Sequence, residues 1–117
     1  MEQPFIREEM LLGSDALQRL KAAHVAVFGI GGVGSYCAEG LARAGLGRLT
    51  LIDNDTVGIS NLNRQIVALH STIGQYKSDV MAARIRDINR ECKVRSLPLL
   101  YTEQTKSQFF PGDYDYL

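Results

Sequence analysis

A glycine-rich segment at residues 29–34 has the residue types and spacing that point most directly to chemistry. It follows the apolar run at residues 25–28 and opens a helical pattern. A strand, a Gly-x-Gly-x-x-Gly turn and a helix form the first unit of a nucleotide-binding βαβ fold. The amides of such a turn and of the first helical turn present partial positive charge to an anion. The segment therefore predicts a phosphate site, with candidate residues Gly29, Gly31, Gly32 and Gly34.

Polar and charged side chains follow the next predicted strand. Asp53 ends that strand, where a carboxylate can accept hydrogen bonds from the ribose of a nucleotide on the glycine turn. The turn and the acid fit NAD and ATP equally. ATP carries about four negative charges and calls for fixed cations, and Arg64 and Lys77 follow Asp53. Lys77 lies at a predicted helix start, where its charge opposes the helix dipole unless a polyphosphate lies beside it. A solvated surface charge is the alternative interpretation of each cation.

The hydrophobic pattern predicts the elements that position these residues. Strands are expected at residues 24–28, 48–52 and 93–97, and helices at 15–20 with Ser14 as cap, at 35–44 and at 77–90. Residues 54–74 show no periodicity, which is typical of a functional loop. A short helix at 102–110 and the start of a fourth strand at 114–117 complete the pattern. Alternating strands and helices imply right-handed parallel crossovers, so the predicted fold is α/β, a Rossmann-like parallel sheet with helices on both faces.

Composition limits the function classes. The 117 residues make one domain at most, and 13 basic and 13 acidic residues give no net charge, so bulk electrostatics do not predict nucleic-acid binding. No apolar run is long enough for a membrane span. The two cysteines lack metal-site spacing, which favours a reducing, cytoplasmic setting. Cys37 is interpreted as a core residue, Cys92 as structural, and His70 as a solvent-facing loop residue.

Four motifs in order carry a family resemblance. They are residues 29–34 (Gly-Ile-Gly-Gly-Val-Gly), 53–57 (Asp-Asn-Asp-Thr-Val), 60–65 (Ser-Asn-Leu-Asn-Arg-Gln) and 74–77 (Gly-Gln-Tyr-Lys). Together they resemble the motifs of the adenylyltransferase superfamily that includes ubiquitin-activating (E1-like) enzymes and enzymes of molybdopterin and thiamin biosynthesis. Within it, the branch that contains the tRNA threonylcarbamoyladenosine dehydratases is most similar, at residues 5–13, 64–66 and 88–92.

The resemblance implies binding of ATP with Mg²⁺ and transfer of AMP to a carboxylate, with release of pyrophosphate. By position, the glycines would hold phosphate, Asp53 the ribose, and Asn61, Arg64 and Lys77 the triphosphate. Arg7 matches an arginine that in this superfamily reaches into the partner subunit's site, which implies a homodimer. The implied catalytic residues are thus Arg64, Lys77 and, in trans, Arg7. Three cations can neutralise the α-phosphate and the leaving group without a protein nucleophile.

The branch also implies a substrate. This is the carboxylate of N6-threonylcarbamoyladenosine in tRNA, which would be dehydrated to its cyclic form. The superfamily's Mg-binding aspartate is expected beyond residue 117, together with the part that contacts tRNA. Residues 1–117 are therefore interpreted as a ThiF- and MoeB-like adenylation domain that lacks the substrate half and is inactive alone. The alternatives are activation of a ubiquitin-like sulfur carrier, a non-catalytic nucleotide-binding or dimerisation module, and an NAD-dependent oxidoreductase.

Overall fold

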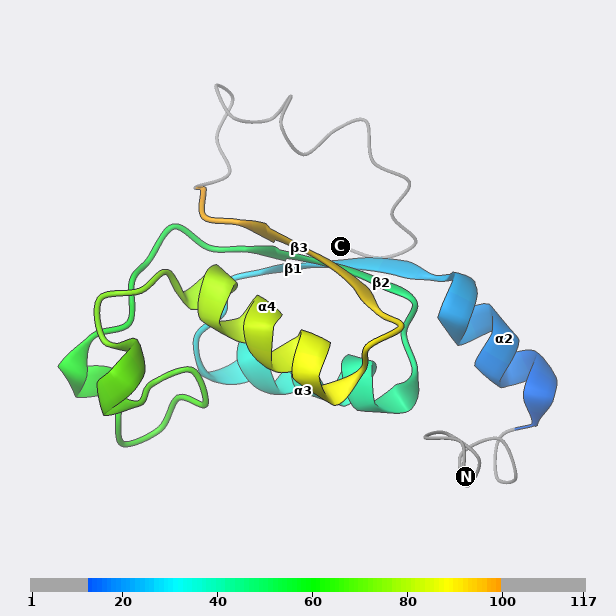
Figure 1. The fold of residues 1–117 in the computed structure, drawn as a ribbon, viewed down its shortest axis with the longest axis horizontal. Helices are drawn as coiled ribbons and strands as arrows, with labels where there is room; N and C mark the ends of the chain where they lie inside the picture. The colour runs from blue at the N-terminus through cyan, green and yellow to red at the C-terminus, as the bar shows by residue number, and fades with distance from the viewer. Residues whose placement is uncertain (1–12, 100–117) are drawn as a thin grey trace.

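The computed structural model describes residues 13–99, which form a parallel β-sheet with helices packed against it (Figure 1). The strands are β1 (His24–Phe28), β2 (Arg48–Ile52) and β3 (Lys93–Leu97), in the spatial order β1-β2-β3. β2 pairs in parallel with both neighbours, with Arg48 opposite His24 on one side and Lys93 on the other. The predicted bounds of all three strands are confirmed, because each strand is a short apolar or alternating run with a turn residue after it.

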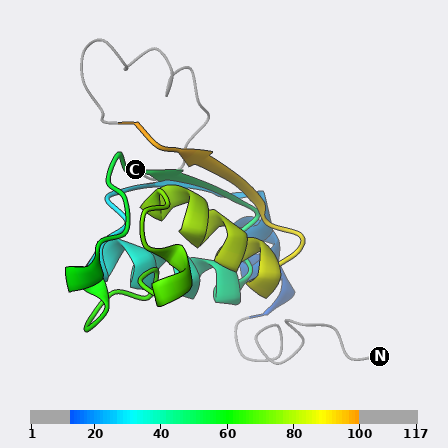
Figure 2. The same ribbon diagram turned by 60° about the vertical axis from the view of Figure 1, so that its left-hand side comes forward.

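Two helices cover one face of this sheet (Figure 2). They are α3 (Gly32–Ala44), which connects β1 to β2, and α4 (Lys77–Ile88), which connects β2 to β3. Crossovers of one hand that step in one direction across a sheet place their helices on the same face. A third helix, α2 (Ser14–Ala22), precedes β1. In the described part of the chain, no helix is long and apolar enough to cross a membrane.

Helix ends differ from the sequence prediction. α3 begins at Gly32 rather than at residue 35, because the glycine turn itself forms the first helical turn. Gly13, not Ser14, occupies the cap position of α2. α4 ends at Ile88 rather than at residue 90, because Asn89 leaves the helical conformation and its Nδ2 donates a hydrogen bond to the Ala42 carbonyl at 3.1 Å.

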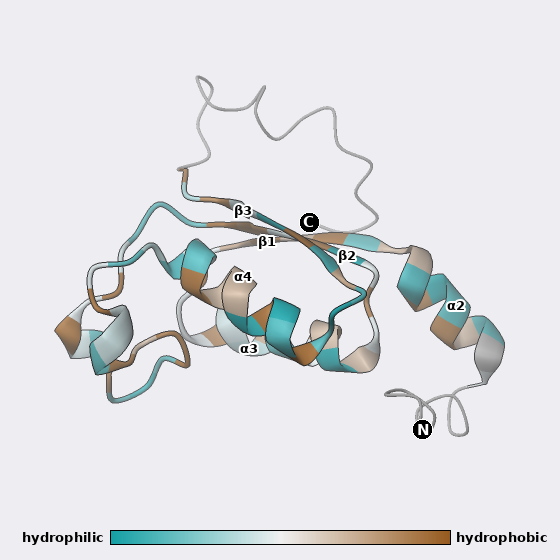
Figure 3. Ribbon diagram, viewed as in Figure 1, coloured by the Kyte–Doolittle hydropathy of each residue, from teal (hydrophilic) through white to brown (hydrophobic). Residues whose placement is uncertain are grey.

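The main core lies between the sheet and the helices α3 and α4. Leu49 and Leu51 of β2 pack there with Met81 and Ile85 of α4, and all four are fully buried. In Figure 3, β1 and β2 are mostly apolar, whereas α4 carries hydrophilic bands. A smaller cluster on the other face joins Ala26, Ile52 and Leu97. Within residues 13–99 both crossover helices lie on the first face, and the elements predicted at residues 102–110 and 114–117 lie outside the described residues.

The segment between β2 and α4 is folded although it is mostly irregular. Its only helical pieces are two short 3₁₀ turns, η1 (Ile59–Asn61) and η2 (His70–Thr72). Thr56 and Tyr76 form an antiparallel bridge that brings the two ends of the segment together. Val57 and Val67 are buried at 2% and 1% exposure and anchor the segment to the core. The segment is therefore a compact loop held beside the carboxyl ends of the strands.

Candidate nucleotide-binding site

The glycine turn follows β1 at the carboxyl end of the sheet. Gly29 has a φ of +88°, a left-handed conformation that glycine adopts without strain. A Cβ on Gly34 would lie 1.8 Å from the Gly29 carbonyl oxygen, so only glycine allows the helix to pass this close to the turn. These two positions confirm the predicted tight turn and the predicted close packing of helix on strand.

Backbone amides at the start of α3 are free to bind an anion. Within the described residues, the amides of residues 31–34 have no hydrogen-bond acceptor. The buried Ser35 hydroxyl is close to two carbonyl oxygens of the same turn, those of Gly31 at 2.6 Å and Gly32 at 3.0 Å. This pairing holds the carbonyls toward the helix, and the helix dipole adds positive potential at the free amides. Ser35 was not among the predicted site residues, although a serine directly after the last glycine of the motif indicates a hydroxyl close to the turn.

Asp53 connects the end of β2 to the glycine turn. Its Oδ2 accepts a hydrogen bond from the Ile30 amide at 2.6 Å, and its Oδ1 accepts one from the Asp55 amide at 2.8 Å. Each carboxylate oxygen keeps capacity for a further hydrogen bond. The predicted contact of Asp53 with ribose stays a prediction. The Ile30 amide, however, is already paired with Asp53 and is not among the amides offered to phosphate.

Lys77 begins α4 and is connected to Asp53 through the backbone of Asp55. Its backbone amide donates to the Asp55 carbonyl at 3.0 Å, so hydrogen bonds run from the glycine turn through Asp53 and Asp55 to the start of α4. Lys77 is only 7% exposed. Its ammonium has no hydrogen-bonded or ionic partner within residues 13–99. The Nζ atom is not among the fully buried unpaired atoms, so the charge is accessible and can contact an anionic ligand.

The other predicted triphosphate residues lie on the loop. Arg64 is exposed, and its Nη1 donates to the Ser60 carbonyl and to Asn63 Oδ1, both at 3.0 Å. Asn61 Oδ1 accepts a hydrogen bond from the Gly58 amide at 2.8 Å. Neither side chain is hydrogen-bonded to the glycine turn, so their contacts with triphosphate stay predictions. Arg7 lies outside the described residues.

The cysteines and histidines lie away from these contacts. Cys37 is exposed, so its interpretation as a core residue was wrong. Cys92 is buried, which agrees with its interpretation as structural, and this burial raises the pKa of its thiol to about 11. His70 is exposed, as predicted, and His24 Nε2 lies 2.8 Å from Thr50 Oγ1. In the described segments, no three His, Cys, Asp or Glu side chains come together as a metal site would require.

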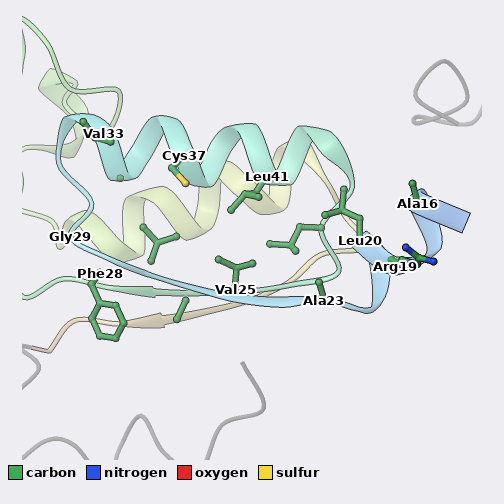
Figure 4. Close-up of a pocket in the computed structure, with 14 residues that line it drawn as sticks. Ala16, Arg19, Leu20, Ala23, Val25, Phe28, Gly29, Val33, Cys37 and Leu41 are labelled. Carbon is green, nitrogen blue, oxygen red and sulfur yellow. The ribbon is translucent and has the colours of Figure 1, made fainter. Parts of the chain in front are cut away.

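Cys37 is exposed because it lines an open recess between β1, α2 and α3. The recess has a volume of about 950 Å³, and its walls are mainly apolar, with Arg19 as the one charged residue among the described ones that line it. In Figure 4, Cys37 and Leu41 point from α3 toward Val25 of β1. Apolar walls do not suit a polyphosphate. The recess therefore differs in chemistry from the polar site formed by the free amides and Lys77. The glycine turn, through Gly29 and Gly34, borders the recess as well as that polar site.

These features define a nucleotide-binding α/β domain of the Rossmann type. The parallel strands, the glycine turn that opens the first crossover helix and the acid at the end of the second strand are its hallmarks. The family model described as "ThiF family" matches residues 6–117. The chain therefore belongs to the ThiF family, which confirms the predicted superfamily.

Similar proteins add detail. The chain is 53% identical, over all its 117 residues, to the tRNA threonylcarbamoyladenosine dehydratase of Bacillus subtilis, and it spans 46% of that relative. A crystal structure of the E. coli tRNA N6-threonylcarbamoyladenosine dehydratase in complex with ATP matches with a TM-score of 0.90 and 47% identity, over 96% of this chain and 46% of that one. The molybdopterin-synthase adenylyltransferase of Haemophilus influenzae is 31% identical over 97 residues. That match covers 83% of this chain and 40% of the relative. The chain thus spans less than half the length of the relatives it matches.

Proposed function

We propose that this chain is the ATP-binding part of an enzyme that adenylates the carboxylate of N6-threonylcarbamoyladenosine in tRNA and closes it to the cyclic form. Similarity over the whole chain supports this substrate, since identity is 53% to a dehydratase and 31% to a molybdopterin-synthase adenylyltransferase. Because the proposed substrates are ATP and tRNA, we also propose that the reaction takes place in the cytoplasm, which agrees with two free cysteines.

The observation that carries the proposal is the chain of hydrogen bonds that connects the glycine turn to the start of α4, where Lys77 lies. Within the described residues, the free amides at residues 31–34 and an ammonium without an ionic partner lie at two helix starts that Asp53 and Asp55 link by hydrogen bonds. A single phosphate or the pyrophosphate of NAD is commonly satisfied by amides alone. The added cation favours ATP, because adenylation builds negative charge on the leaving pyrophosphate.

The proposed chemistry has two steps. A carboxylate oxygen attacks the α-phosphorus of ATP, a P–O bond forms, and the bond to the β-phosphate oxygen breaks to release pyrophosphate. An atom of the same threonylcarbamoyl group then attacks the activated carbonyl and expels AMP, so that the nucleoside loses one water overall. The protein orients the two reactants and supplies positive charge where the phosphates gain negative charge.

Magnesium belongs to this proposal as the counter-ion of ATP. Of the described carboxylates near the turn, Asp53 already accepts two backbone hydrogen bonds and Asp55 is exposed. These residues can contact a hydrated Mg²⁺, but they do not form a dedicated ligand set, and Mg²⁺ is commonly held by few carboxylates together with substrate phosphates. When bound, the ion would neutralise phosphate charge, and Lys77 would do so from the protein side.

The test uses the full-length protein with ATP, Mg²⁺ and tRNA that carries threonylcarbamoyladenosine. Mass spectrometry of the digested nucleosides should show ATP-dependent loss of one water. The Lys77→Met variant should lose this activity, and Lys93→Met, an exposed lysine on β3, should retain it. An unchanged nucleoside, together with ATP consumption on addition of a ubiquitin-like sulfur carrier, would favour the second candidate instead.

We also propose a homodimer in which Arg7 of one subunit acts at the site of the other. Arg7→Ala and Lys77→Met subunits should each be inactive alone. When they are mixed and allowed to exchange, half of the dimers regain one intact site, and about a quarter of the wild-type activity should return. No recovery in a mixture that forms mixed dimers would place Arg7 at the site of its own subunit.

A further inference from the structure

The loop between β2 and α4 places one of its side chains, that of Gln65, beside the glycine turn. The Nε2 atom of Gln65 lies 3.7 Å from the position that a Cβ on Gly31 would occupy, so the amide group lies beside the turn, across the space that a larger residue at 31 would fill. The Gln65 backbone is fixed on both sides. Its amide donates to the Asn61 carbonyl and its carbonyl accepts from the Ala68 amide, each at 3.0 Å.

The side-chain amide of Gln65 lies close to backbone N–H groups that have no hydrogen-bond acceptor within the described residues. The amides of residues 31–34 have no acceptor within the described residues, and Gln65 Nε2 adds two more N–H groups beside them. The oxygen of the same amide group, Oε1, is buried and has no hydrogen-bond partner within the described residues. A buried acceptor calls for a donor such as water, so Oε1 does not contact phosphate, and the N–H groups of Nε2 are the part of this amide that suits an anion.

We propose that Gln65 donates a hydrogen bond from Nε2 to a phosphate oxygen of the nucleotide on the glycine turn. This inference rests on the proposed function, because it requires a nucleotide at that turn. The group that Gln65 recognises is the phosphate, not the adenine or the ribose. Gln65 is thereby a neutral donor that the loop brings to the turn, whereas Lys77 supplies the charge from the start of α4.

Gln65→Glu is the most informative change, because glutamate keeps the shape of the side chain and replaces the donor by a charged acceptor. Gln75→Glu is the matched control, since Gln75 lies on the same loop and its Nε2 donates to the Ser71 carbonyl at 3.1 Å, away from the turn. Gln65→Met, which removes the donor without adding charge, is the second variant if glutamate impairs folding.

The experiment measures binding of ATP, AMP and adenosine to the full-length protein, by calorimetry for the nucleotides and by ligand-observed NMR for adenosine. Gln65→Glu should weaken ATP and AMP at least tenfold and leave adenosine within about twofold of the parent protein, as expected for a contact with phosphate alone. Gln65→Met should show a smaller loss with the same pattern, and Gln75→Glu should change neither.

Each other outcome has a distinct meaning. Equal loss for adenosine and ATP would show that Gln65 only supports the loop, and unchanged ATP affinity in both Gln65 variants would exclude the contact. Failure of the parent protein to bind ATP would overturn the proposed function itself.

Discussion

At the scale of single residues, Lys77 is unfavourable for the fold and suited to a ligand. Its charge stands at the positive end of the α4 dipole, and the side chain is only 7% exposed. Lys77→Met keeps the apolar stem and removes the charge, so the nucleotide-free protein should gain roughly 0.3–1 kcal/mol of stability. The same change should abolish the rise in Tm that ATP produces.

Thermal unfolding with and without ATP checks both parts of this prediction. Lys93→Met, on the exposed side of β3, should leave the ATP-induced shift as it is. A Lys77→Met protein that is less stable than the parent, or that is still stabilised by ATP, would show that the ammonium supports the fold rather than the ligand.

Gly34 shows how a single missing Cβ decides the shape of the turn. A methyl group there would lie 1.8 Å from the Gly29 carbonyl oxygen, a backbone atom that cannot move without opening the turn. Gly34→Ala should cost about 3 kcal/mol or more in urea unfolding. Gly40→Ala on the same helix has open space around its Cβ and should instead stabilise by roughly 0.5–1 kcal/mol. Equal effects at the two positions would contradict the close approach.

At the scale of elements, one acid ties the two covering helices together. Glu39 of α3 accepts hydrogen bonds from Arg84 of α4 at 2.5 Å and from Arg43 at 3.2 Å. The hydrogen bond from Arg84, followed by that from Arg43, lowers the Glu39 pKa below 4.5, and burial opposes them. The pair is partly exposed, so Glu39→Gln should cost about 0.5–1 kcal/mol at neutral pH.

The pH dependence of that cost follows from the direction of the shift. A carboxyl group with a lowered folded-state pKa stabilises the protein above its unfolded pKa and loses this contribution as pH falls through the folded-state pKa. The stability difference between the parent and Glu39→Gln should therefore be full at pH 7 and shrink below about pH 4.5. Urea unfolding at pH 7 and near pH 3.5 measures it, and a difference that is the same at both values would mean that the ionised carboxylate is not responsible.

The elements also show which features can be predicted from sequence. Strand bounds and the acid after β2 were predictable because they depend on local pattern and on a motif. The start of α3 was missed because glycines that disfavour helices elsewhere form its first turn here. The position of Gln65 beside Gly31 and the hydrogen bond between Asp53 and the Ile30 amide involve residues far apart in the chain, and no periodicity encodes such neighbours.

At the scale of the whole molecule, the polar and apolar sides of the glycine turn have different neighbours. The free amides, Asp53 and Lys77 lie together at the carboxyl ends of the strands. The apolar recess extends along β1, which in the described residues has a strand on one side only. Phe28 and Val33 border it and are 42% and 86% exposed, so the recess is an uncovered apolar surface of these residues.

The two cysteines report on this surface, because one lines the recess and the other lies in the core. The thiolate is the form that attacks a thiol reagent, and the pKa of Cys92, raised to about 11, leaves little thiolate at pH 8, while burial blocks access to it. In the 117-residue chain at pH 8, a polar maleimide should modify Cys37 rapidly and Cys92 only after unfolding in urea. Cys37→Ser should abolish the rapid reaction and Cys92→Ser should leave it. A slow Cys37 in the folded chain would mean that the recess is covered, and a faster rate in this chain than in a longer form of the protein would show that further residues cover it there.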